Sequence, residues 1–189
     1  MAVLTRILYG LPLAIALLCA TADAQTGNYP LSLPEQKIKA GLLYNFLKYT
    51  QWPIPGGEEG SMTVCLWGGD AFSGSLHPMN GRIVNQREIL LREVDSMEEV
   101  EQCHLLYVNA AMQKQWPGLA EALKGKSVLT VSDFDGFVHN GGMIEFSRKD
   151  QRIQVEVNLQ AIKDAHLMVQ ESLLRLASVV HPASAKKVQ

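Results

Sequence analysis

The clearest hydrophobic period lies in the stretch PEQKIKAGLLYNFLKYTQWP, residues 34–53. Pro34 and Glu35 suit the first turn of a helix, and the pair Trp52-Pro53 ends the pattern. Between them, apolar side chains recur at helical spacing, which predicts an amphipathic helix with Ile38, Leu42, Phe46 and Tyr49 on one face.

Short apolar runs follow this helix, separated by glycine, proline or charged residues. Each is short enough for a buried strand, and they occupy residues 61–67, 87–94, 103–109 and 127–133. A helix is expected within residues 112–125, a charged hairpin over 141–158, and helical segments over 159–165 and 171–180. This order predicts an α/β fold with three layers, a Rossmann-like sheet flanked by helices and a C-terminal hairpin.

The first 24 residues have a different pattern, typical of a cleaved secretory signal. Arg6 precedes a mostly apolar run, and Ala22 and Ala24 occupy the small-residue positions before a cleavage site, which predicts a mature chain that starts at Gln25. The run contains Gly10 and Pro12 and is shorter than the roughly 20 residues of a membrane-spanning helix. We therefore expect a signal peptide (1–24), an N-terminal tail (25–34), one domain (35–180) and a C-terminal tail (181–189).

Charge and cysteine content narrow the class of protein. The formal net charge is -2, and because removal of the signal takes away one basic and one acidic residue it stays at -2, which favours neither nucleic acid nor an anionic membrane as a partner. Cys65 and Cys103 are the cysteines of the mature chain, and an even pair in an exported protein predicts a disulfide. Two buried free thiols are the alternative.

The stretch VLTVSDFDGFVHNGGMIEF, residues 128–146, carries Ser132, Asp133 and His139 in one loop. These residue types can form a hydrolase triad, but the serine lacks the G-x-S-x-G flanks of a nucleophile elbow, so a turn that bonds its own backbone is the better interpretation. We expect no catalytic residues. The loop remains a candidate contact for a ligand or partner through Ser132, Asp133, Phe134, His139, Gly141 and Gly142.

The other motifs indicate no cofactor. GGDAF, residues 68–72, is close to the GGDEF signature of diguanylate cyclases, but Ala71 replaces an acidic residue, and a tight turn explains the motif better. The glycine pairs lack the spacing of a dinucleotide or phosphate cradle. The five histidines form no pair at metal-ligand spacing, so no metal site is expected.

A series of phrases resembles the YfiR-like family of small exported bacterial proteins. It includes IKAGLLYNFLKYTQWP, CLWGGDAF, CHLLYVN, VLTVSDFDGF, GGMIEF and RIQVEVNLQAIKDAHL, and it extends from about Glu35 to Ala177. The resemblance implies a periplasmic protein with an α/β fold that is no enzyme and that holds an inner-membrane diguanylate cyclase inactive by binding the periplasmic domain of that cyclase. It thus implies lower cyclic di-GMP and less biofilm, with contact to the membrane only through the partner.

Two further expectations follow. The family resemblance and the apolar surface of the first helix predict a homodimer that uses Ile38, Leu42, Tyr44, Phe46 and Tyr49. A periplasmic module that binds a small molecule is the alternative function, and a secreted hydrolase is a more distant one.

Overall fold

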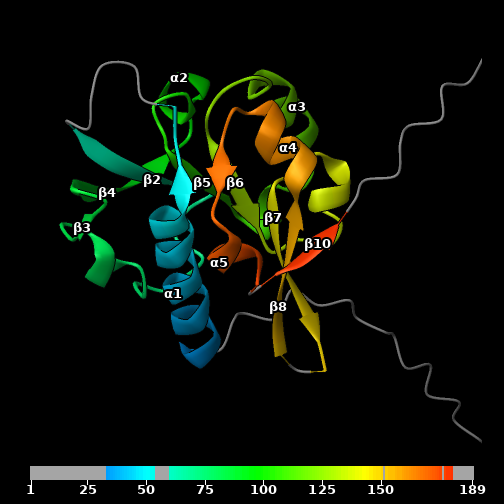
Figure 1. The fold of residues 1–189 in the computed structure, drawn as a ribbon, viewed down its shortest axis with the longest axis horizontal. Coiled ribbons are helices and arrows are strands. Elements are labelled where there is room, and N and C mark those ends of the chain that lie inside the picture. Colours follow the sequence, from blue (N-terminus) through cyan, green and yellow to red (C-terminus); the bar gives the residue numbers. More distant parts are fainter. Residues whose placement is uncertain (1–32, 54–59, 151, 176, 181–189) are drawn as a thin grey trace, which may run out of the picture. The chain divides into compact units, whose positions relative to one another are not determined.

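The computed structural model describes residues 33–53, 60–150, 152–175 and 177–180. Its main feature is a mixed sheet of eight strands in the order β10-β8-β7-β6-β5-β2-β4-β3 (Figure 1). The strands are β2 (Ser61–Trp67), β3 (Ile83–Val84), β4 (Arg87–Val94), β5 (Leu105–Val108), β6 (Leu129–Ser132), β7 (Ile144–Lys149), β8 (Arg152–Asn158) and β10 (Ser178–Val180). Neighbours from β4 through β2, β5 and β6 to β7 are parallel, and β7 and β8 form the antiparallel hairpin.

Helices cover both faces of this sheet. They are α1 (Leu33–Tyr49), α2 (Met97–Val100), α3 (Trp116–Ala122), α4 (Leu159–Asp164) and α5 (Glu171–Leu174), with short 3-10 turns η1 (His77–Met79), η2 (Ala110–Met112) and η3 (Val138–Asn140). A separate two-stranded ladder joins β1 (Thr50–Gln51), directly after α1, to β9 (Met168–Val169).

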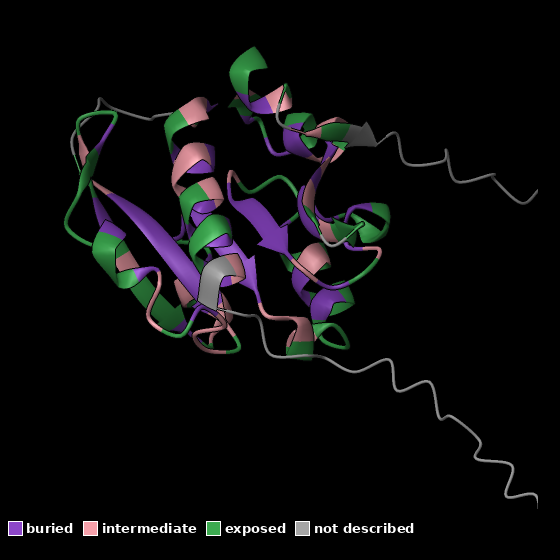
Figure 2. Ribbon diagram, turned by 90° about the horizontal axis from the view of Figure 1, so that it is seen from below, coloured by how far each residue is buried: buried purple, intermediate pink, exposed green. Residues whose placement is uncertain are grey.

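Two hydrophobic clusters make the layers. One contains Phe46 of α1 with residues of α4 and α5, and the other contains Trp116 and Leu119 of α3 with Val100 of α2. Every residue of β5 and β6 is buried, as expected for strands that are covered on both sides (Figure 2). The predicted α/β class with a Rossmann-like sheet, flanking helices and a hairpin is thus confirmed.

The first helix differs from its prediction in its end and in its buried face. It ends at Tyr49, because Thr50 and Gln51 pair with β9 instead of extending the helix. The buried side chains of α1 include Leu43 and Leu47 and also the polar Gln36 and Lys39. The predicted apolar face is wrong for its first member: Ile38 is 55% exposed, while Leu42 and Tyr49 are partly buried and Phe46 lies in the core.

The C-terminal part also needs one correction. The segment expected to be helical over residues 171–180 contains a helix of four residues, and Ser178–Val180 then form a strand parallel to β8. Pairing with an existing strand edge decides the conformation of such a short segment, and local propensity does not report that pairing.

Candidate functional site

The loop after β6 binds its own polar side chains. Ser132 is fully buried, its hydroxyl donates to the carbonyl of Val108 at 2.7 Å, and its Oγ accepts from the amide of Phe134 at 3.3 Å. Phe134 packs edge-to-face on Phe137 in the second hydrophobic cluster. Neither residue is exposed, so the accessible part of this predicted loop is limited to other residues.

A buried carboxylate holds the same loop from below. Glu145 of β7 accepts from the amides of Gly136 and Val138, both at 3.1 Å. Burial raises the pKa of Glu145 and the two amide hydrogen bonds lower it, with a raised pKa as the net result. Since the carboxylate is 4% exposed, its role in this structure is to fix the loop backbone.

The glycine pair and His139 complete the loop. Gly141 has a φ of 88°, and Gly142 lies so close to Phe137 that a Cβ there would meet the ring at 2.3 Å. Backbone geometry therefore explains both glycines. His139 and Gly141 are exposed and border a groove of about 550 Å³ that also includes Trp116.

The GGDAF segment forms a tight turn after β2. Asp70 accepts from the amides of Phe72 and Gly74 at 2.7 and 2.6 Å, so both carboxylate oxygens serve the turn. Gly68 and Gly69 have φ values of 89° and 80°, a backbone conformation that favours glycine. The prediction of a structural turn agrees with this geometry.

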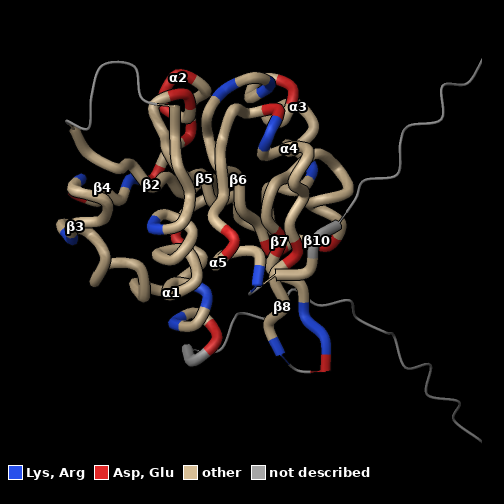
Figure 3. The backbone as a smooth tube through the Cα atoms, in the orientation of Figure 1, with Lys and Arg blue, Asp and Glu red and all other residues tan. Residues whose placement is uncertain are grey.

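At the carboxyl edge of the parallel strands, buried charges are paired. Lys39 of α1 is 4% exposed, and its Nζ lies 3.1 Å from Asp133 and 3.3 Å from Glu35. Arg148 of the hairpin also pairs with Glu35, which links the start of α1 to β7 (Figure 3). Asp133, a predicted loop residue, thus acts in the contact between helix and sheet.

Two polar atoms beside these charges have no partner among the described residues, Tyr107 Oη and Gln36 Oε1. The Tyr107 side chain is fully buried and lies edge-on to Phe72, with ring centroids 4.6 Å apart. Burial, with the carboxylate of Asp133 as a further cause, raises the pKa of Tyr107 well above its ordinary value. The tyrosine is therefore a neutral phenol.

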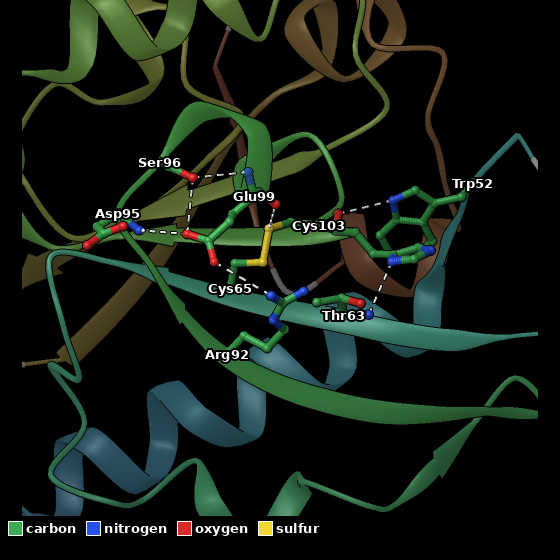
Figure 4. Close-up of a disulfide and its surroundings, with 9 residues drawn as sticks. Trp52, Thr63, Cys65, Arg92, Asp95, Ser96, Glu99 and Cys103 are labelled. Carbon is green, nitrogen blue, oxygen red and sulfur yellow. Dashed lines mark hydrogen bonds and ion pairs between the residues drawn. A yellow bond between two sulfur atoms is a disulfide. The ribbon is translucent and has the colours of Figure 1, made fainter.

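The amino edge of the same strands centres on His104. The indole Nε1 of Trp52 donates to the carbonyl of His104 at 3.1 Å, and the amide of Thr63 donates to its Nδ1 at 3.1 Å (Figure 4). Burial, and then the charge of Arg87, lower the pKa of His104 to about 4, so the imidazole is neutral at neutral pH.

Arg87 begins β4 and faces this histidine. Its Nη2 donates to the carbonyl of Ser61 at 2.8 Å and lies 2.8 Å from Nε2 of His104. Beside it is a cavity of about 440 Å³, lined by Thr50, Gln51, Trp52, Met62, Asn85, Gln86, Arg87 and Gln170.

The predicted disulfide is present and lies next to this edge. Cys65 of β2 and Cys103, directly before His104, have Cα atoms 5.9 Å apart and are bonded (Figure 4). Both are buried, and Sγ of Cys103 also lies 3.2 Å from the carbonyl of Glu99.

Sequence reasoning missed the amino-edge group. Thr50 and Trp52 were assigned to the end of a helix, and Arg87 only to the start of a strand. The available signal was the sequence Asn85-Gln86-Arg87 before an apolar run: Asn85 and Gln86 both have positive φ, which is typical of a tight hairpin turn.

The sequence matches the family model described as YfiR/HmsC-like over residues 36–178, more than half of the chain. The chain therefore belongs to the YfiR/HmsC-like family, as its resemblance predicted. No curated protein matches the sequence.

Solved structures share only part of the architecture. One is an ABC domain in complex with L-Trp from Streptococcus pneumonia, with 10% identity, a TM-score of 0.44, and coverage of 63% of this chain and 55% of the other. Another is a conserved domain protein from Vibrio cholerae O1 biovar El Tor, with 11% identity, a TM-score of 0.48, and coverage of 76% and 59%. The chain spans little more than half the length of each.

Two searches of the described residues were negative. No group of three or more histidine, cysteine, aspartate or glutamate side chains in that part of the chain could hold a metal ion. No helix within it has the length and apolar character needed to cross a bilayer.

Proposed function

We propose that this protein acts in the periplasm as a repressor of an inner-membrane diguanylate cyclase, which it binds through the cyclase's periplasmic sensor domain. Membership of the YfiR/HmsC-like family over residues 36–178 is the observation that carries the proposal. A buried disulfide between Cys65 and Cys103 supports it, because such bonds persist in oxidising compartments such as the periplasm. The predicted signal peptide, residues 1–24, lies outside the described residues.

We propose further that the protein works by binding and without catalysis of its own. Ser132, the residue with the best claim to be a nucleophile, is fully buried and donates its hydrogen bond to a backbone carbonyl. His139 is exposed and has no hydrogen-bond partner among the described side chains. These placements argue against a serine hydrolase, which needs a base within hydrogen-bonding reach of the hydroxyl.

The proposed homodimer uses the outer surface of α1. Ile38 is exposed there, and Leu42 and Tyr49 are only partly buried, whereas Phe46 is stacked on Phe146 in the core and is not available. The surface is therefore smaller than the sequence predicts, and Ile38 is its most exposed apolar residue.

Deletion of the gene tests the proposed repression. We expect cyclic di-GMP and biofilm to rise in the deletion strain and to return to normal with the full chain expressed in the periplasm. Crosslinking of the full chain in intact cells should then recover a membrane protein that has a periplasmic domain and a cyclase domain. Unchanged cyclic di-GMP in a strain that retains its cyclases would contradict the proposal.

Matched variants locate the binding surfaces. Ile38→Lys on α1 and Ile83→Lys on β3 replace two apolar residues that are 55% and 63% exposed, on different elements. Light scattering should give a monomer only for Ile38→Lys, with Ile83→Lys as its control. His139→Ala tests the loop: lost repression with retained partner binding would favour the alternative function of a small-molecule sensor.

A further inference from the structure

The amino edge of the sheet contains two hydrogen-bond donors that face each other. A neutral imidazole has one N–H donor and one acceptor nitrogen. In His104 the acceptor is Nδ1, because the amide of Thr63 donates to it at 3.1 Å. The proton is then on Nε2, and Nε2 lies 2.8 Å from Nη2 of Arg87, which is also a donor.

Neither protonation state of His104 removes this conflict. A protonated ring carries a proton on both nitrogens and would add a second positive charge beside Arg87. An acceptor atom that enters from the adjacent cavity would accept from both groups and would allow them to move apart. The geometry therefore asks for an oxygen that is negatively charged or strongly basic.

Other polar atoms around the cavity are in the same situation. Thr50 and Arg87 both line it, and Thr50 Oγ1 and Arg87 Nε are buried atoms without a hydrogen-bond partner among the described residues. Thr50 is 1% exposed, so its hydroxyl has lost water without gaining a replacement. Such orphaned groups are uncommon in folded proteins and call for a partner.

The acceptors near this edge already have donors. The carbonyls of Leu47 and Lys48, at the end of α1, accept from the side-chain amide of Asn85 at 3.4 and 3.2 Å. The carbonyl of Tyr49 accepts from the amide of Gln170 at 2.9 Å. The helix end is thus satisfied, and the groups left over at the cavity are mainly donors.

We propose that this cavity binds a small organic carboxylate. Arg87 receives the carboxylate through its Nε and Nη2, the paired geometry that a guanidinium offers to this group. Nε2 of His104 and the hydroxyl of Thr50 donate to the same oxygens. Trp52 and Met62, which also line the cavity, contact the apolar body of the ligand, and a volume of about 440 Å³ suits a molecule of that size.

Direct binding to the full mature chain, with its disulfide intact, tests this site. Benzoate is the probe, benzamide is its neutral counterpart, and inorganic phosphate represents an anion without an apolar body. We expect benzoate to bind in calorimetry and to shift the His104 ring signals in NMR spectra. We also expect benzamide and phosphate to bind at least tenfold more weakly. Equal affinity for phosphate would overturn the assignment to a carboxylate.

Three variants distinguish this site from others. Arg87→Gln should weaken benzoate binding at least tenfold, whereas Arg92→Gln, the same change on the same strand outside the cavity, should leave it unchanged. Thr50→Val removes a hydroxyl that has no partner, so the protein should fold normally and bind benzoate several times more weakly. Unchanged affinity in Thr50→Val and Arg87→Gln would overturn the proposal.

A carboxylate of the chain itself is the competing source. Glu58 and Glu59 precede Gly60 in a segment outside the described residues, and a Cβ at Gly60 would lie 3.9 Å from Nη2 of Arg87. Benzoate binding that appears only in a Glu58→Gln/Glu59→Gln variant would overturn the proposal of an external ligand. All these measurements use the isolated protein, so their outcome does not depend on the proposed cyclase partner.

Discussion

The two edges of the parallel sheet solve the same problem differently. At the carboxyl edge, buried Lys39 lies between the carboxylates of Asp133 and Glu35. At the amino edge, Arg87 and His104 face each other, and no ion pair involves Arg87 among the described residues. Open α/β sheets usually bind ligands at the carboxyl edge. In this protein that edge is closed by internal charges, and the unsatisfied donors lie at the other edge.

Helix α1 connects the two edges. Its first turns carry Glu35, Gln36 and Lys39 at the carboxyl edge, and its last carbonyls accept from Asn85 at the amino edge. Thr50, which lines the cavity, directly follows the helix. The comparison teaches that charge pairing holds one end of α1 in place, while a cavity at the other end leaves room for a ligand to act on it.

The largest expected effect concerns the disulfide next to the amino edge. Cys65→Ala/Cys103→Ala removes a crosslink between residues 38 positions apart. The chain-entropy relation gives about 4 kcal/mol of stabilisation for a loop of this size, so urea denaturation should show a loss of that order. Mass spectrometry of the wild type, alkylated without reductant, should find no modified cysteine among these two.

A loss below about 1 kcal/mol in the double variant would show that the disulfide does little for the folded state. In that case the amino edge would be held mainly by Trp52, Thr63 and His104 through their hydrogen bonds. The single variants are poor controls, because each leaves a free thiol that can form other bonds.

Loss of the buried lysine should have the next largest effect, at the carboxyl edge. Lys39→Met leaves Asp133 and Glu35 as neighbouring carboxylates without the cation between them. Removal of one member of a buried ion pair destabilises by about 3 kcal/mol or more. Lys37→Met, an exposed change on the same helix, should alter the free energy of unfolding by no more than about 0.5 kcal/mol.

The pH dependence of stability should be sensitive to His104. Its pKa in the folded protein is about 4, below the ordinary 6.5, so the unfolded chain binds more protons between these values. Stability therefore rises with pH across this window and is lost as pH falls from 6.5 towards 4. Because the ring is only half-buried, we expect a contribution of about 1–2 kcal/mol.

His104→Asn tests this contribution without loss of the main hydrogen bond, since Oδ1 of asparagine can accept from the amide of Thr63. The variant should show a flatter stability profile between pH 4 and 6.5. A profile as steep as that of the wild type would assign the dependence to other groups, such as Glu145 with its raised pKa.

Much of this architecture follows from local patterns, and the two edges mostly do not. The strands over residues 61–67 and 87–94 were predicted at their observed bounds, and the pairing of Cys65 with Cys103 was predicted from export. Lys39 was not predicted to be buried, because a charged residue on an amphipathic helix usually faces water unless a partner far along the chain pairs with it.

The amino edge depends on the same kind of distant contact. Thr50 extends a helical pattern in the sequence, and only its pairing with Val169 makes it part of a strand. Arg87 meets His104 because β4 and β5 both lie beside β2 and start at the same edge. Spacing along the chain contains no information on which donors will lack an acceptor after the strands have assembled.

The smallest expected effect comes from Tyr107→Phe, which sharpens the comparison between the edges. Its hydroxyl is buried and has no partner among the described residues, so removal of Oη should leave the free energy of unfolding unchanged or raise it by up to about 1 kcal/mol. Thr50→Val deletes a similar orphaned hydroxyl at the amino edge, and only that change should weaken benzoate binding. Denaturation and calorimetry on both variants make the test. A loss of more than about 1.5 kcal/mol in Tyr107→Phe would mean that the phenol has a partner such as water or Asp133. Weaker benzoate binding in the same variant would mean that the two edges are coupled through the sheet.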